Sequence, residues 1–133
     1  MGPFPHDAPA PQIDATNPAG TDGFEFVEYA HPNPEELHTL FKRMGFTPVA
    51  RHRTKAVTLY RQGDVNYLIN EEPGSYAANF VGLHGPCAPS MAFRVVDAKQ
   101  AYDRAISLGA KPADTSKGAP TLNVPVIEGI GGG

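Results

Sequence analysis

Two kinds of hydrophobic pattern alternate along the chain, and they predict helices and strands in turn. One amphipathic helix is predicted by apolar residues at the spacing i, i+3, i+4 and i+7: Leu37, Leu40, Phe41 and Met44. Residues 56–62 and 66–70 are rich in β-branched and aromatic side chains, which favour strands. Gly63 and Asp64 lie between these segments and are typical of a hairpin turn. The pattern therefore predicts an α+β domain.

The helix and the segment after it recur later in the chain. Residues 44–49 (MGFTPV) correspond to residues 108–113 (LGAKPA), and three of the four apolar helix positions stay apolar in the second copy. Gly45 and Gly109 end the two predicted helices, where glycine adopts the positive φ of a left-handed C-cap without a Cβ clash. A predicted strand precedes each helix. We therefore expect two copies of one supersecondary module to pack together.

The two modules are predicted to follow the same element order, but the second is incomplete. Module one, residues 23–72, runs β-α-β-β-β. A linker helix follows at 75–84, with Ser75 as its N-cap and with Gly85 and Pro86 ending it. Module two, residues 90–133, lacks its last strand, and its predicted elements are a strand at 91–96, a helix at 98–108 after the N-cap Asp97, a strand at 111–114 and an extended segment at 121–127.

The two ends of the chain differ in composition from the middle. Five prolines fall within residues 1–20, so residues 1–21 are predicted to be a disordered leader, and residues 22–133 the folded domain. Gly131, Gly132 and Gly133 lack the Lys-Ser/Thr of a phosphate loop and are interpreted as a turn toward the missing strand.

Composition excludes several classes of function. The formal net charge is -3, and no Lys/Arg-rich stripe is present, which argues against a nucleic-acid partner. No apolar run approaches the ~20 residues that a membrane span needs. Cys87 is the single cysteine, and the first residues do not form a secretory signal, so we expect a cytoplasmic protein without disulfides.

Several stretches, in this order and spacing, resemble the N-terminal half of bacterial 4-hydroxyphenylpyruvate dioxygenase, a member of the vicinal-oxygen-chelate superfamily. The stretches are 23–28 (GFEFVE), 44–46 (MGF), 59–63 (LYRQG), 84–86 (HGP), 91–95 (MAFRV) and 129–132 (GIGG). The resemblance implies a fold of paired β-α-β-β-β modules. It also implies an enzyme of tyrosine catabolism that converts 4-hydroxyphenylpyruvate and O2 to homogentisate and CO2.

The same resemblance implies that the catalytic cofactor lies outside this chain. Such enzymes hold one Fe(II) by two His and one Glu, all in the C-terminal half. The chain alone is therefore predicted to be inactive, with its own C-terminal catalytic half and further copies of itself as partners, and an aromatic 2-oxo acid as the substrate of the whole enzyme. Hydroxymandelate synthase shares that substrate, and the residues that distinguish the two products would also lie in the absent half.

Two other functions stay open. A domain of this kind can serve as a non-catalytic scaffold or oligomerisation module. It can also be the dioxygenase-like part of another enzyme, such as a dehydroshikimate dehydratase that fuses it to a barrel domain, although the leader that begins at Met1 disfavours this alternative.

A metal site within the chain has only weak candidates. By analogy with the catalytic half, the first-strand ligand position falls at or near Glu28, and Ser90 occupies the position where the catalytic half has a histidine. The third ligand would come from the missing strand. We therefore predict that Glu28 is a hydrogen-bonded carboxylate at the end of a strand, and that no catalytic or cofactor-binding residue is present.

Structural roles are also predicted for the remaining histidines and for Cys87. His31 is expected to be exposed before a proline-rich turn, and His38 to lie on the polar face of its helix, opposite Leu37, Leu40 and Phe41. His52 is predicted to lie at a solvated strand end, with the basic cluster around it an alternative anion site. His84 is expected to cap a helix C-terminus, and Cys87 has no neighbouring group in sequence that would make it a nucleophile.

The missing strand has an energetic consequence. Each buried side chain that it would supply contributes about 1.5–3 kcal/mol, whereas a whole domain is stable by only about 5–15 kcal/mol. Its absence also leaves backbone groups unpaired at a sheet edge. We therefore expect the isolated polypeptide to be marginally stable, oligomeric, or a fragment of a longer product.

Overall fold

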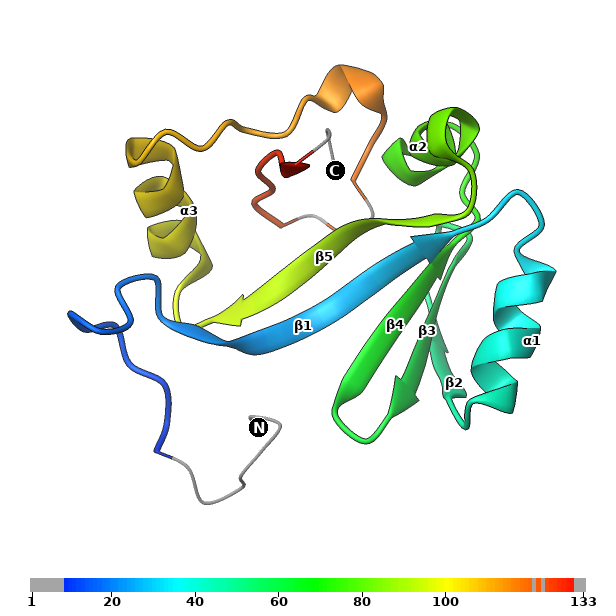
Figure 1. The fold of residues 1–133 in the computed structure, drawn as a ribbon, viewed down its shortest axis with the longest axis horizontal. Helices are drawn as coiled ribbons and strands as arrows, with labels where there is room; N and C mark the ends of the chain where they lie inside the picture. Colours follow the sequence, from blue (N-terminus) through cyan, green and yellow to red (C-terminus); the bar gives the residue numbers. More distant parts are fainter. Residues whose placement is uncertain (1–8, 121, 123, 131–133) are drawn as a thin grey trace.

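A five-stranded mixed sheet organises the computed structural model, which describes residues 9–120, 122 and 124–130 (Figure 1). Three α-helices and one 3-10 turn accompany the sheet. The elements in chain order are β1 (Thr21–Ala30), α1 (Glu35–Arg43), β2 (Thr47–Arg51), β3 (Val57–Gln62), β4 (Val65–Asn70), α2 (Tyr76–His84), β5 (Cys87–Val95), α3 (Ala98–Ser107) and the 3-10 turn η1 (Thr115–Lys117). The predicted α+β class is confirmed.

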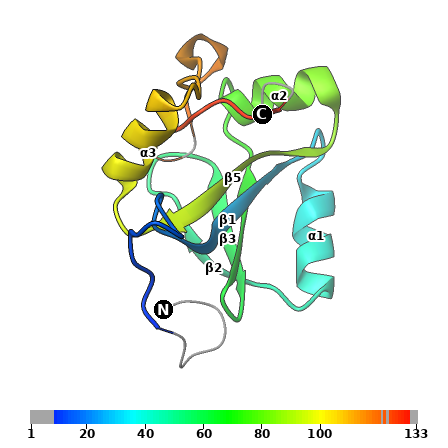
Figure 2. The same cartoon turned by 60° about the vertical axis from the view of Figure 1, so that its left-hand side comes forward.

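The first strand joins the two modules. The strand order is β2-β3-β4-β1-β5. β1 pairs in parallel with β4 of its own module, and in antiparallel orientation with β5, the opening strand of the second module. The helices α1 and α3 consequently lie at opposite ends of the molecule. α1 lies beside β2–β4, and α3 lies near the end of β5 (Figures 1 and 2).

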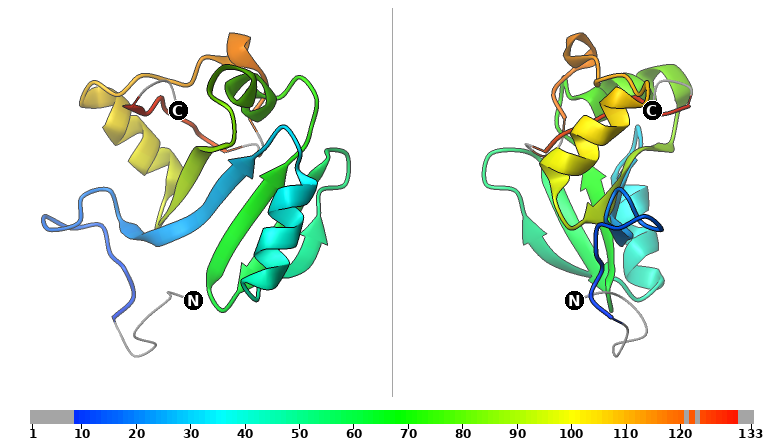
Figure 3. Two further views of the ribbon diagram at one scale, coloured as in Figure 1. Left: turned by 45° about the vertical axis from the view of Figure 1, so that its right-hand side comes forward. Right: turned by 90° about the vertical axis from the view of Figure 1, so that its left-hand side faces the viewer.

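An aromatic core fills the space between α1 and the sheet. The left view of Figure 3 shows this helix lying across β2–β4. The buried members are Phe41, Phe46, Tyr60 and Ile69, and the half-buried side chains of Tyr29, Leu37 and Tyr67 pack against them. The rings of Phe46 and Tyr67 stack at 4.5 Å between centroids, and Phe41 meets Tyr60 edge-on at 5.5 Å. Such offset and edge contacts add to the stabilisation that apolar burial provides.

The face of α1 that was predicted to point inward is only partly correct, because the helix is rotated about its axis relative to the prediction. Phe41 is 2% exposed, but Leu40 is 48% exposed, although both were assigned to the inward face. At about 100° per residue, Leu40 and His38 lie on opposite flanks of the Leu37–Phe41 stripe. The helix turns its His38 flank toward the sheet because His38 finds polar partners there, on Tyr60 and Glu71.

The predicted caps are confirmed. The Ser75 side chain accepts a hydrogen bond from the backbone N–H of Ala78 at the start of α2, and Asp97 accepts one from Gln100 at the start of α3. Gly45 has a φ of 94°, the conformation that the end of α1 required. No helix in the described part of the chain has the length and apolarity needed to cross a membrane.

The strand predicted at 111–114 does not form. Among the described residues of this segment and of the predicted extended segment 121–127, only Pro112 and Ile127 make a β-bridge, although hydrogen bonds on either side show that the two segments run antiparallel. Proline lacks a backbone N–H, and Pro112 and Pro125 lie within these two segments. The ladder therefore cannot extend, while Thr121 and Asn123 lie outside the described residues.

The predicted leader is too long. Residues 14–20 form turns in which the Asp14 side chain accepts hydrogen bonds from the backbone of Thr16 and Asn17. The Gly20 carbonyl then accepts a hydrogen bond from the backbone N–H of Val96 at 2.9 Å. These Asx turns satisfy backbone N–H groups of the polar segment with side-chain hydrogen bonds. The folded region therefore begins before the expected boundary at residue 22. Residues 1–8 and 131–133, which include the predicted glycine turn, lie outside the described residues.

The rotated helix face can be tested by two alanine substitutions. Phe41→Ala is expected to lower the free energy of unfolding by about 3–5 kcal/mol, because it empties a closed aromatic core. Leu40→Ala, its matched control one residue away, is expected to cost about 1 kcal/mol or less, since that side chain is half in water. Urea unfolding followed by circular dichroism measures both. Equal losses would contradict the observed orientation of α1.

Candidate functional site

A buried carboxylate lies where β1, β4 and β5 meet. Glu28 is 2% exposed and is paired across the sheet with Ser90 of β5. Its Oε1 accepts a hydrogen bond from the Ser90 hydroxyl at 2.9 Å, and its Oε2 accepts one from the Asn70 side-chain amide at 3.1 Å. The side chain thus connects the two modules through polar contacts, as well as through the backbone ladder.

Burial governs the protonation of this group. Desolvation raises the pKa of Glu28 above its ordinary value, while the hydrogen bonds from Asn70 and Ser90, and the positive charge of Lys55, oppose the shift. A carboxyl group held in this way can keep its proton at a pH where an exposed glutamate has lost it. Its chemistry is that of a proton-holding or hydrogen-bonding group.

The neighbours of Glu28 do not fit an iron site of two histidines and one carboxylate. Its hydrogen-bond partners are a hydroxyl and an amide. His31, three residues later, uses Nδ1 to accept the backbone N–H of Asn33 at 2.8 Å, and its Nε2 pairs with Glu36 at 2.8 Å. Both ring nitrogens therefore serve the turn into α1, and the expectation of an exposed His31 was wrong, because the ring is mostly buried.

Three further candidates have local roles. The Nδ1 atom of His52 accepts the backbone N–H groups of Thr54 and Lys55, each at 3.2 Å, and so shapes the turn between β2 and β3. His84 is in the last turn of α2, and its ring lies 4.3 Å from that of Phe80. Burial and the charge of Glu28 both raise the pKa of the Cys87 thiol, which disfavours the thiolate that a nucleophile requires.

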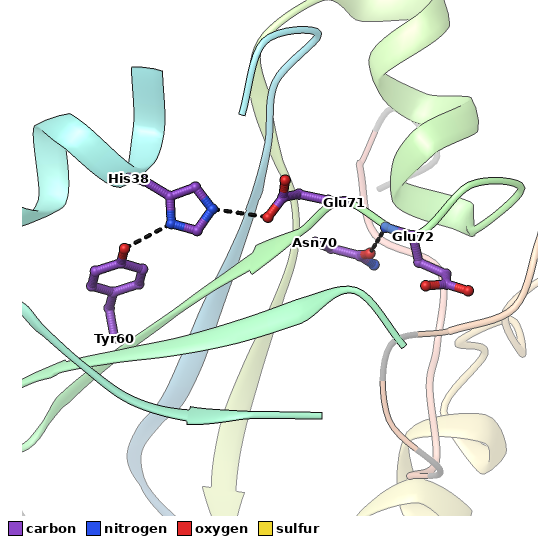
Figure 4. A network of polar contacts seen from close by, with 5 residues as sticks. All are labelled: His38, Tyr60, Asn70, Glu71 and Glu72. Carbon is purple, nitrogen blue, oxygen red and sulfur yellow. Dashed lines mark hydrogen bonds and ion pairs between the residues drawn. The ribbon is translucent and has the colours of Figure 1, made fainter. Parts of the chain in front are cut away.

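His38 is part of a polar network that the sequence pattern did not reveal (Figure 4). Its Nδ1 lies 2.7 Å from the Tyr60 hydroxyl, and its Nε2 lies 2.8 Å from Oε2 of Glu71. The prediction that His38 lies on the polar face of its helix was wrong, because its side chain is only 15% exposed. Its partners are 22 and 33 residues away along the chain, so they come together only because α1 packs against β3 and the end of β4.

A second acidic residue, Glu35, lies beside this network. Glu35 is one helical turn before His38, and ligand atoms of Glu35, His38 and Glu71 all lie within 4.8 Å of one another. On the other side, the Asn70 side-chain oxygen accepts the backbone N–H of Glu72 at 2.9 Å, as Figure 4 also shows. The end of β4 therefore connects the His38 network with the Glu28 network through consecutive residues.

Comparison with known proteins identifies the family. The family model described as "Hydroxyphenylpyruvate dioxygenase, HPPD, N-terminal" matches residues 15–133. The chain belongs to this family. The match also includes residues 15–21, which agrees with the turns seen there and confirms the resemblance to the N-terminal half of these dioxygenases.

Individual relatives of this dioxygenase-family chain are longer than it is. A 4-hydroxyphenylpyruvate dioxygenase of Pseudomonas sp. (strain P.J. 874) is 53% identical over 116 residues, which cover 87% of this chain and 32% of that protein. A 3-dehydroshikimate dehydratase of Pseudomonas aeruginosa is 37% identical over 131 residues, 96% of this chain and 20% of that protein. The chain thus spans about a third of the first relative's length, and less of the second.

A solved structure shows the same fold. It is described as a xylose isomerase-like TIM barrel/4-hydroxyphenylpyruvate dioxygenase fusion protein and is 34% identical, with a TM-score of 0.76. The similarity covers 99% of this chain and 20% of that one. The dioxygenase-like fold therefore also occurs joined to a barrel.

The raised pKa of Glu28 predicts a pH dependence of stability. The folded chain holds this proton more tightly than the unfolded chain, so the stabilisation is fully present below the ordinary pKa of 4.5 and is lost as pH rises through the raised value. The Glu28→Gln variant has no such proton. We therefore expect the stability of the wild type relative to this variant to fall as the pH rises above the ordinary pKa of a glutamate.

Urea unfolding at a series of pH values measures this difference. Glu36→Gln makes the same replacement at an exposed position, so the contrast between the two variants isolates the effect of burial. A stability difference between the wild type and Glu28→Gln that stays constant with pH would contradict a raised pKa of Glu28.

Proposed function

We propose that this chain is the N-terminal, non-metal half of a 4-hydroxyphenylpyruvate dioxygenase. The observation that carries the proposal is the family match over residues 15–133, together with 53% identity to a protein of that name. The whole enzyme would convert 4-hydroxyphenylpyruvate and O2 to homogentisate and CO2 in the cytoplasm. An Fe(II) ion in the C-terminal half would supply the oxygen chemistry, held there by two His and one Glu.

The role proposed for this chain is structural. The hydroxyl and amide around Glu28 support this role, because they replace the imidazoles that an iron site would need. Phe24 on β1 and Phe93 on β5 support it as well, since they stack at 5.1 Å while remaining exposed, and Met91 is exposed two residues along β5. Exposed apolar groups of this kind favour contact with further polypeptide, either the catalytic half or a second copy in a homo-oligomer.

A second candidate is the dioxygenase-like part of a 3-dehydroshikimate dehydratase. It is favoured by the 37% identity over 96% of the chain and by the barrel-fused solved structure. The identity to the dioxygenase is higher, which is why we place the dehydratase second.

The reaction itself distinguishes these functions. The full-length protein, supplied with Fe(II) and 4-hydroxyphenylpyruvate, is expected to consume O2 and to form homogentisate, whereas residues 1–133 alone form none. Oxygen uptake and mass spectrometry of the product measure both. Conversion of 3-dehydroshikimate without homogentisate would support the dehydratase instead, and activity of residues 1–133 alone would contradict the structural role.

Iron content tests the assignment of Glu28. In the full-length protein, Glu28→Gln is expected to leave the iron bound per chain unchanged, because Glu28 is not among the proposed ligands. Elemental analysis after removal of free metal provides the measurement. Loss of one iron per chain in this variant would show that the N-terminal half contributes a ligand.

A further inference from the structure

The strongest unassigned feature is the group of Glu35, His38 and Glu71. It combines an imidazole nitrogen with two carboxylates, whose ligand atoms lie within 4.8 Å of one another. We propose that these three side chains bind a divalent transition metal ion of the Zn²⁺ type, at a site separate from the proposed iron centre. This proposal is independent of the function proposed above, so either can fail without the other.

The first two ligands come from one helical turn. Glu35 begins α1, and His38 follows three residues later, so both side chains lie on the same side of the helix. The spacing Glu-x-x-His is one that metal-binding helical bundles use to direct a carboxylate and an imidazole toward one ion. Glu71 directly follows β4, and it supplies the third ligand from the sheet.

Tyr60 fixes the histidine in the orientation that metal binding requires. It is 1% exposed, packs edge-on against Phe41, and holds Nδ1 of His38 at 2.7 Å. With a metal on Nε2, the imidazole carries its proton on Nδ1 and donates it to the Tyr60 oxygen. Such outer contacts set the tautomer and ring orientation of metal-bound histidines, so the orientation of the ring is already in place.

Two carboxylates lie around one imidazole nitrogen in this cluster. A divalent cation bound between them would neutralise this local excess of negative charge. The mixed nitrogen and oxygen donors suit Zn²⁺ or Co²⁺ better than Ca²⁺ or Mg²⁺, which prefer oxygen ligands alone.

The geometry needs only a small adjustment. Nε2 of His38 and Oε2 of Glu71 are 2.8 Å apart, whereas two ligands of a tetrahedral Zn²⁺ ion, each about 2.0–2.1 Å from it, lie roughly 3.3 Å apart. The ion would take the place of the hydrogen bond between these two atoms, and the single proton of the neutral imidazole would then lie on Nδ1. Glu35 is exposed, so its side chain can rotate to complete the site, and water can fill the fourth position.

Titration of the 133-residue chain with Co²⁺, followed by its visible absorption and by competition with Zn²⁺, tests the proposal. We expect one saturable site per chain. Glu35→Gln removes a ligand from an exposed position and should weaken binding by about tenfold or more. Its control, Glu36→Gln, changes the neighbouring glutamate, which pairs with His31 instead, and should leave the affinity within about twofold of the wild type.

Two further variants separate metal binding from a purely structural role. His38→Gln keeps hydrogen-bonding capacity but should abolish the Co²⁺ absorption. Tyr60→Phe removes only the outer contact and should weaken Co²⁺ binding by about 10–100-fold, with circular dichroism confirming the fold. The proposal is overturned if no saturable site is found, if His38→Gln leaves binding intact, or if Glu36→Gln weakens binding as much as Glu35→Gln. Those results would make the cluster a hydrogen-bonded link between α1 and β4 only.

Discussion

The position of β1 between β4 and β5 is the constraint on which the rest of the structure depends. One edge of this strand pairs in parallel with β4 of the first module. The other edge pairs in antiparallel orientation with β5, the first strand of the second module. Glu28 adds polar contacts to both neighbours, with Asn70 on one side and Ser90 on the other. A buried carboxylate is expensive unless its oxygens are satisfied or protonated, so this residue makes the register of all three strands specific.

Under the proposed function, the same arrangement lets one fold serve both a catalytic and a structural half. The first strands of the two modules bring their side chains to a common point, and the residue types at that point decide what can bind there. Here Glu28 meets a hydroxyl and an amide, a set suited to a hydrogen-bonded junction. The family would then supply the fold, while the donor atoms at the junction would distinguish a structural half from one that holds iron.

Local sequence signals predicted most of the elements, and they failed where distant contacts decide. The caps at Ser75 and Asp97 and the C-cap at Gly45 depend on adjacent backbone, and their prediction was confirmed. The orientation of α1 could not be predicted from its own periodicity, because the partners of His38 come from β3 and from the residue after β4. A signal against the strand predicted at 111–114 was present in the sequence, since Pro112 interrupts it and Pro125 interrupts the segment opposite. Glu35-x-x-His38 was also visible in the sequence, but its meaning depends on Glu71, which only the fold brings close.

The central claim is that this chain is one half of a larger dioxygenase, and the coding sequence beyond codon 133 tests it most directly. The account predicts an open reading frame that continues into a second pair of β-α-β-β-β modules, with a histidine on each of two opening strands and a glutamate on the last strand. This continuation would bring the protein to about three times the present length. The matched residues likewise make up 32% of the dioxygenase of Pseudomonas sp. (strain P.J. 874). A stop codon directly after Gly133 would contradict the claim.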